Sequence, residues 1–182
     1  MCNEETYPVE IKDDEVILRA AFRPYNANKS GKIKLNLFSP PKNLNELSCM
    51  RSSIMSIGDC FKKAKEIAGV QKEFHGFALI TNHCAKNSFP EGDKTIEIYI
   101  KDSRHHFLGH ADLIIGIKSL TESEPLPPSD KEKLDNIKSN LHRHTLFVTQ
   151  NGIVDNQEIH CDKNELLSNF VVDNKVLDII ST

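Results

Sequence analysis

The sequence lacks tryptophan, has no apolar run near the roughly 18 residues that a membrane-spanning helix needs, and has no block of about five or six like charges. Its first ten residues, MCNEETYPVE, are acidic and polar, unlike a secretory signal peptide. Acids and bases are interspersed, with a formal net charge of -3, so the basic stripe typical of nucleic-acid-binding proteins is missing. We therefore expect a cytoplasmic protein that binds neither membranes nor nucleic acids.

Several chemical signatures are also missing. The five cysteines are odd in number and form no C-x-x-C pair, which disfavours a disulfide framework and fits a reducing compartment. The chain has no H-E-x-x-H, no P-loop, no G-x-G-x-x-G and no G-x-S-x-G. These absences exclude the common zinc-protease, nucleotide-binding and serine-hydrolase signatures. No cofactor follows from the sequence, and we predict no metal site.

The 182 residues and 38% apolar content predict a single domain over residues 1–182. Residues 1–13 form a loose lead-in, and residues 170–182 form an apolar C-terminal tail. Periodicity predicts two main helices, at 56–69 and 129–141. Strands are predicted at 15–22, 32–38, 74–81, 95–101, 111–117, 144–150 and 153–161. Because strands mostly follow one another, the pattern favours an α+β fold with a largely antiparallel, twisted sheet.

Local signals refine these elements. Ser56 with Asp59, and Ser129 with Glu132, predict N-terminal caps for the two helices. Asn151-Gly152 predicts a tight hairpin turn. Residues 44–53 are expected to be extended or a turn, and residues 82–93 a polar loop.

A histidine cluster gives the best candidate site. His105, His106 and His110 lie in the segment DSRHHFLGHADLIIGI, residues 102–117, directly before an apolar strand. On a strand, His110 and Asp112 share one face, so the carboxylate could orient the imidazole for acid–base catalysis. The alternative is that His110 caps the strand and bonds the backbone. A metal site would need His106 beside His110, which helical spacing gives but the expected loop does not.

Two arginines are candidate anion holders. Arg19 interrupts an apolar strand and could face a cleft, where a guanidinium binds carboxylate or phosphate. The alternative is an edge position from which Arg19 reaches water. Arg51 is the second candidate, with a surface salt bridge as its alternative.

The chain resembles an uncharacterised bacterial family through several short motifs. They are Leu18-Arg19, F-S-P-P at 38–41, L-S-C-M-R-S-S at 47–53, G-F-A-L at 76–79 and G-H-A-D-L at 109–113. Cys49-Met50 stands where that family has a valine and an acidic residue. The resemblance implies that Arg19, Ser48, Arg51 and His110 belong to one site. The chain also resembles ADP-ribosyltransferase-like folds more loosely, with Glu158 or Glu165 as the late glutamate that such folds need.

Two functions follow as hypotheses. The first is a small enzyme acting on a phosphate-bearing or nucleotide substrate, with His110 and Asp112 catalytic and Arg19, Ser48 and Arg51 binding substrate. The second is a non-catalytic accessory or binding module of a bacterial conflict or defence system. This module would dock a protein partner through a strand edge or through the apolar tail.

Overall fold

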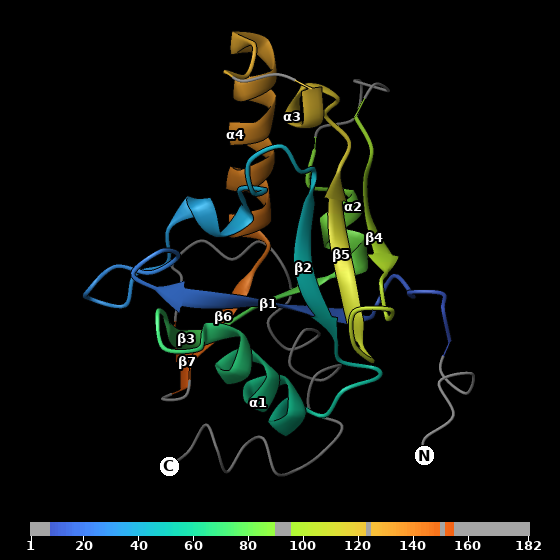
Figure 1. Cartoon of the computed structure of the whole chain (residues 1–182). Coiled ribbons are helices and arrows are strands. Elements are labelled where there is room, and N and C mark those ends of the chain that lie inside the picture. The colour runs from blue at the N-terminus through green and yellow to red at the C-terminus, as the bar shows by residue number, and fades with distance from the viewer. Residues whose placement is uncertain (1–7, 90–95, 123–124, 150–151, 155–182) are drawn as a thin grey trace.

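The protein is built on a seven-stranded sheet in which every neighbouring pair is antiparallel (Figure 1). The computed structural model describes residues 8–89, 96–122, 125–149 and 152–154. The strands are β1 (Val16–Arg23), β2 (Glu46–Arg51), β3 (Glu73–Thr81), β4 (Ile98–Asp102), β5 (His110–Ile115), β6 (Leu146–Thr149) and β7 (Gly152–Val154). Their order across the sheet is β4-β5-β2-β1-β3-β6-β7. The predicted α+β class with a largely antiparallel sheet is confirmed.

The junction between β1 and β2 divides this sheet into two parts. β1 pairs with β3 from Val16 to Arg23, and β2 pairs with β5 from Glu46 to Met50. By contrast, β1 and β2 pair only through Ile17 with Arg51 and Leu18 with Met50. Beyond that point they part, and β2, β5 and β4 stand across the direction of β1 and β3 (Figure 1). The parting leaves a wedge between two strands that are neighbours in the same sheet.

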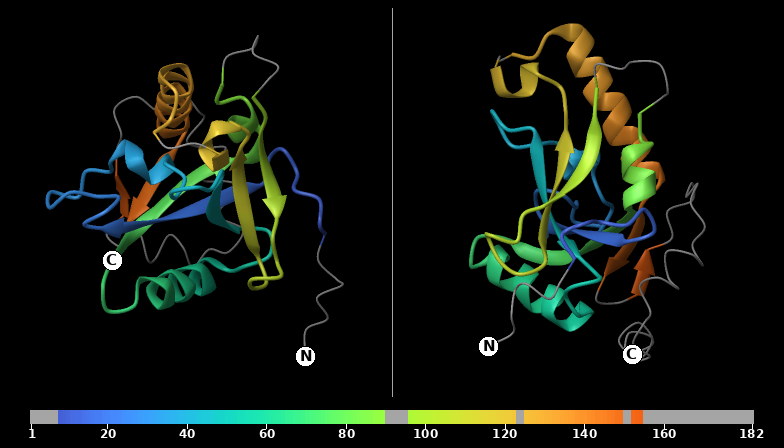
Figure 2. Two further views of the ribbon diagram at one scale, coloured as in Figure 1. Left: turned by 45° about the horizontal axis from the view of Figure 1, so that its top comes forward. Right: turned by 90° about the vertical axis from the view of Figure 1, so that its right-hand side faces the viewer.

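Helices cover both faces of the sheet (Figure 2). α1 (Ile57–Ala68) packs on one face through Cys60, Ala64 and Ala68, against Val16, Leu18 and Ala20 of β1. The other face packs against α4 (Pro128–Arg143) and the one-turn 3-10 helix η2 (Leu35–Phe38). The short helices α2 (Asn82–Lys86) and α3 (Ser119–Glu122) lie on that side too. Because successive side chains of β1 point to opposite faces of the sheet, they contribute to two separate hydrophobic cores, as the sequence pattern predicts.

Helix caps agree with the sequence for α1 and disagree for α4. The Ser56 hydroxyl accepts a hydrogen bond from the Asp59 backbone N–H, and Gly69 ends α1 at a positive φ of 57°. α4 begins one residue before Ser129, at Pro128, and makes no side-chain capping bond. Proline at the first helical position has no N–H to satisfy, so α4 starts without the predicted cap.

Two predicted elements are wrong. Residues 32–38 were expected to form a half-exposed strand, but Ile33 makes only an isolated bridge to Ala27, and η2 follows. Leu37 and Phe38 are both fully buried, which a strand with one solvent-facing side does not allow. Residues 82–93 were expected to be a loop, yet α2 occupies 82–86, capped by the Thr81 hydroxyl. Within the described ranges, every helix is too short or too polar to cross a bilayer.

A buried ionic cluster fastens the closed side of the β1–β2 junction. Arg51 is fully buried, and its Nε and Nη2 donate to the two oxygens of Glu15 at 2.8 and 2.9 Å. Its Nη1 donates to Asp102 at the end of β4 at 2.5 Å. The backbone carbonyls of residues 8–10 accept the remaining N–H groups. A fully hydrogen-bonded guanidinium is tolerated in a core, so this cluster joins β1, β2 and β4.

Asp102 makes this cluster sensitive to acid. Burial alone would raise the pKa of Asp102, but hydrogen bonds from Arg104 and Arg51 outweigh it and hold the pKa at about 2. The depressed pKa contributes stability that is complete above the unfolded pKa of 3.8 and is lost as the pH falls towards 2. This contribution is about 2 kcal/mol.

We predict that Asp102→Asn lowers the free energy of unfolding at pH 7 and flattens its decline between pH 5 and 2, relative to the unmodified chain. Chemical denaturation at a series of pH values measures both quantities. Asp135→Asn is the control, because Asp135 pairs with Lys138 on the exposed side of α4 and should contribute little. An unchanged pH profile in Asp102→Asn would show that the carboxylate is not held by the arginines.

Candidate functional site

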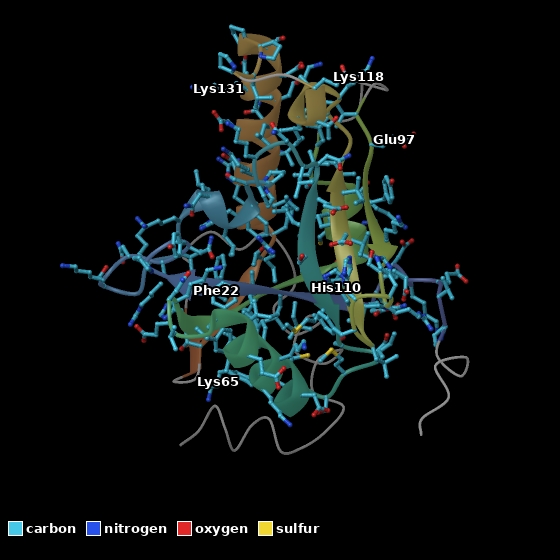
Figure 3. All side chains as sticks on the ribbon, viewed as in Figure 1. Phe22, Lys65, Glu97, His110, Lys118 and Lys131 are labelled. Atoms are coloured by element: carbon cyan, nitrogen blue, oxygen red, sulfur yellow. The ribbon has the colours of Figure 1, made fainter. Side chains whose placement is uncertain are left out.

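A cavity of about 340 Å³ opens where β1 and β2 part. Two features determine which side chains line it: the alternation of side chains along each strand, and the separation of β1 from β2. The lining residues are Leu18, Arg19, Ala20 and Phe22 of β1, Glu46, Ser48, Cys49 and Met50 of β2, His110 and Asp112 of β5, His106 and Phe107 before β5, and Ile67 of α1. Figure 3 labels His110 on β5 near the point where β2 passes β1. The cavity therefore contains four predicted site residues: Arg19, Ser48, His110 and Asp112.

Arg19 spans the wedge between the separated strands. Its Nη1 donates to the Ser48 carbonyl of β2 at 2.6 Å, and its Nε donates to the Leu37 carbonyl of η2 at 3.3 Å. Nη2 makes no hydrogen bond to the part of the chain that the structure describes, and no described carboxylate pairs with Arg19. Burial lowers the pKa of Arg19, opposed by Cys49 and Asp112, but a guanidinium remains charged at pH 7. One edge of a cation is thus left available within the cavity.

His110 begins β5 and is 5% exposed. Its Nε2 lies 3.8 Å from Asp112 Oδ1, which is too long for a hydrogen bond, and its buried Nδ1 has no hydrogen-bond partner among the residues that the structure describes. Burial lowers the pKa of His110, opposed by Asp112 and reinforced by His106, so the ring is neutral at pH 7. The alternative of a ring that bonds the backbone keeps one supporting feature, because a backbone hydrogen bond with Ser103 acts to raise the pKa of His110. An unpartnered buried nitrogen of this kind is unusual in a folded protein.

The turn before β5 brings two residues to the His110 ring: His106 of the predicted histidine cluster, and Phe107, which the sequence did not indicate. The rings of His106 and His110 lie 4.8 Å apart between centroids, and those of Phe107 and His110 lie 4.9 Å apart. Gly109 makes this return possible with a φ of 83°, which side-chain-bearing residues rarely adopt. Spacing of four residues between His106 and His110 was the available signal. That spacing predicts proximity on a helix, whereas here a turn brings the two rings together.

Three of these side chains could hold a cation. The ligand atoms of His106, His110 and Asp112 all lie within 4.8 Å of one another. His106 is exposed at the mouth of the cavity, while the other two are buried. Ser48 pairs with Asp112 across the sheet and lies next to this group. The hollow is lined by one guanidinium, the two carboxylates of Glu46 and Asp112, and two imidazoles.

Arg51 does not join this group, so the expected convergence of both arginines is wrong. It follows Met50 on β2, and strand alternation turns it away from the cavity. Its guanidinium is fully engaged by Glu15, Asp102 and the carbonyls of residues 8–10. Arg51 therefore stabilises the junction and has no N–H left for a substrate.

The remaining candidates lie outside the described residues. They are Glu158 and Glu165, Asn151 of the predicted turn and the apolar tail at 170–182. β6 and β7 pair antiparallel, as predicted, but Thr149 lies opposite Gly152, so Gly152 belongs to β7 rather than to the turn and the predicted register is wrong by one residue.

Cys49 lines the cavity but is a poor nucleophile. Burial raises the pKa of Cys49 to about 11, opposed by Arg19. A thiol is reactive only as the thiolate, so Cys49 is inert near neutral pH. Cys60 is fully buried on α1, with a pKa raised by burial to about 12, which confirms its role as a core residue.

We predict that iodoacetamide at pH 8 modifies Cys84, which is half-buried, well before Cys49 or Cys60 in the folded protein. Peptide mass spectrometry over a time course distinguishes the three thiols. Denatured protein, in which all three should react alike, is the control. Early modification of Cys49 would mean that its thiol is exposed to solvent through the cavity.

Comparison with known proteins assigns no family. No protein-family model matches the chain, and it has no significant match among curated proteins or solved structures. The function therefore has to be argued from the cavity alone.

Proposed function

We propose that this protein is a small cytosolic enzyme that acts on a phosphate-bearing substrate, such as a nucleotide, in the cavity between β1 and β2. Arg19 holds the phosphate group, and His110 with Asp112 carries the chemistry. The observation that supports this most is that two unsatisfied groups line one hollow. They are Arg19 Nη2 and His110 Nδ1, neither of which has a hydrogen-bond partner among the described residues.

The dimensions and walls of the cavity fit such a substrate. A volume of about 340 Å³ falls at the lower end of the range for small-molecule sites. Leu18, Phe22, Met50 and Phe107 supply apolar and aromatic surface for an organic portion. Arg19 supplies planar, directed donors that suit a phosphate. A phosphate group attached to a small organic body is therefore the substrate class that we propose.

Arg19 is already positioned to bind an anion. Two of its nitrogens are tied to the carbonyls of Leu37 and Ser48, so the side chain loses little freedom when a ligand binds. The acid–base role of His110, with Asp112 orienting the ring, stays a prediction. At 3.8 Å the imidazole and carboxylate would need to approach further in the complex, as catalytic hydrogen bonds often do.

We predict that Arg19→Met weakens the binding of inorganic phosphate and of adenosine monophosphate roughly 10- to 100-fold, the loss expected for a charge-assisted hydrogen bond. Arg19→Lys should recover only part of the affinity, because lysine keeps the charge and loses the planar donors. Isothermal titration calorimetry gives both values.

Arg143→Met is the matched control, since Arg143 is exposed at the end of α4. Circular dichroism and thermal melting should accompany each variant, because Arg19 also bonds two backbone carbonyls. A folded Arg19→Met variant that binds both ligands as tightly as the unmodified protein would contradict the proposal.

For turnover, we predict that His110→Ala reduces phosphate or nucleotide conversion by at least about a hundredfold, as expected for loss of the reactive group. Product release from a panel of phosphomonoesters and nucleotides, followed by mass spectrometry, measures this. His83→Ala on the exposed side of α2 is the control. Equal rates in His110→Ala and the unmodified chain would exclude His110 from the chemistry.

The binding-module alternative retains one supporting feature. β4 lies at one edge of the sheet, and Tyr99 on it is 41% exposed. Such an edge can pair with a partner strand. Ligand binding without any turnover, together with loss of a protein partner on truncation after Asn169, would favour this alternative over the enzyme.

A further inference from the structure

We propose that His106, His110 and Asp112 form a binding site for one divalent transition-metal ion in the cavity beside Arg19. The inference deepens the proposed function and rests on it in one respect: the ion would face the phosphate group that Arg19 holds. Its chemical class is that of Zn²⁺, because two imidazole nitrogens and one carboxylate oxygen suit borderline ions better than Mg²⁺ or Ca²⁺.

The distances already approach those of such a site. All candidate ligand atoms lie within 4.8 Å of one another, and His110 Nε2 lies 3.8 Å from Asp112 Oδ1. Ligands around a tetrahedral zinc ion, with bonds of about 2.0–2.2 Å, lie roughly 3.4 Å apart. His106 is exposed on a turn, so its side chain has room to move the remaining distance. The two buried ligands need little adjustment.

The backbone explains why these three residues meet. Alternation on β5 places His110 and Asp112 on one face of the strand. The turn before β5 folds His106 back over the His110 ring, and the positive φ of Gly109 completes that turn. His106 and His110 therefore come together without lying on a helix. A strand and its entry turn provide the same proximity.

A second observation points to a missing ligand. His110 is 5% exposed, and its buried Nδ1 has no hydrogen-bond partner within the described part of the chain. Asp112 is equally buried and accepts no hydrogen bond from the residues that the structure describes. Buried polar groups without partners are unfavourable, and each oxygen or nitrogen here is a good metal ligand. A cation coordinated through Nδ1 would give this nitrogen a partner, and it would offset the buried charge of Asp112.

The charge balance of the cavity gives a third argument. Arg19, Glu46 and Asp112 all line it, so the two carboxylates outnumber the one guanidinium. A phosphate placed there would meet the Asp112 carboxylate and be repelled. A divalent ion on Asp112 reverses this local charge and gives the phosphate a second cation opposite Arg19. Three protein ligands also leave a coordination position open for substrate or water.

The test uses the full, tag-free chain stripped of metal with a chelator. Zn²⁺ is titrated by calorimetry, and Co²⁺ is added as a spectroscopic probe of the coordination shell. We expect one ion per chain, and affinity reduced by at least about tenfold in His106→Ala, His110→Ala and Asp112→Asn. Because His106 is exposed, His106→Ala should fold normally even if a change at the buried ligands disturbs the strand.

Two matched controls separate this site from other imidazoles. His83→Ala changes a histidine next to Cys84, and His160→Ala changes a histidine next to Cys161; both should leave the affinity unchanged. Absence of stoichiometric binding overturns the inference. Binding that survives His106→Ala and Asp112→Asn, or that is lost in either control, overturns it as well.

Phosphate titrations on metal-free and Zn²⁺-loaded protein distinguish this inference from the proposed function. Arg19-dependent phosphate binding without a metal site would refute the metal and leave the proposed function standing. A metal site with no phosphate affinity in either form would refute the proposed function and leave the ion assigned to these three residues. Tighter phosphate binding in the loaded protein, lost in both Arg19→Met and His106→Ala, is the expected result.

Discussion

The brief pairing of β1 with β2 is the constraint on which this molecule depends. Two residue pairs join the strands, and then each continues with a different neighbour. On the closed side of this junction, Arg51 ties Glu15 to Asp102, and on the open side Arg19 reaches from β1 to the Ser48 carbonyl. The closed side adds ionic contacts to the hydrophobic core that both parts of the sheet share. Without the parting there would be no cavity.

The two arginines have different roles. Arg51 stabilises the junction between β1 and β2, whereas Arg19 lines the cavity. Arg51 loses all contact with water, and it is stable there because each of its nitrogens donates to an acceptor. Arg19 is only half-buried and has two of its three nitrogens engaged. The remaining donors have nothing to bond within the described ranges. The two arginines therefore differ in role because, among the described residues, all nitrogens of Arg51 are hydrogen-bonded and one nitrogen of Arg19 is not, and burial alone does not explain the difference.

Sequence patterns predicted the elements that depend on local physics. Alternation identified β1 and the two faces that feed separate cores, and Ser56, Asp59 and Gly69 marked the ends of α1. The pattern at residues 32–38 was misleading, since alternating leucines also suit a single 3-10 turn whose last two residues are buried. Local periodicity cannot distinguish these cases when the covering partner, α4, comes about a hundred residues later.

The site was harder to predict because its membership depends on register. Arg19 and Arg51 both interrupt apolar strands, and nothing near either residue says which will meet acidic partners. Only the pairing of Ile17 with Arg51 brings Arg51 close to Glu15, which directly precedes β1. His110 and Asp112 were predictable as a pair, because alternation on one strand is local. His106 was not, because its position depends on a turn.

The parting of the strands also explains why Arg19 is organised before any ligand arrives. In a continuous sheet the Ser48 carbonyl would bond a backbone N–H of β1, whereas here the guanidinium takes that place. The carbonyl is therefore satisfied whether or not the cavity is filled, and Arg19 need not give up this bond to bind an anion with its free edge. The ordering of a long, flexible side chain has already occurred on folding. The separation of β1 from β2 thus has two consequences. It creates the cavity, and it leaves the Ser48 carbonyl free to fix the Arg19 guanidinium beside that cavity.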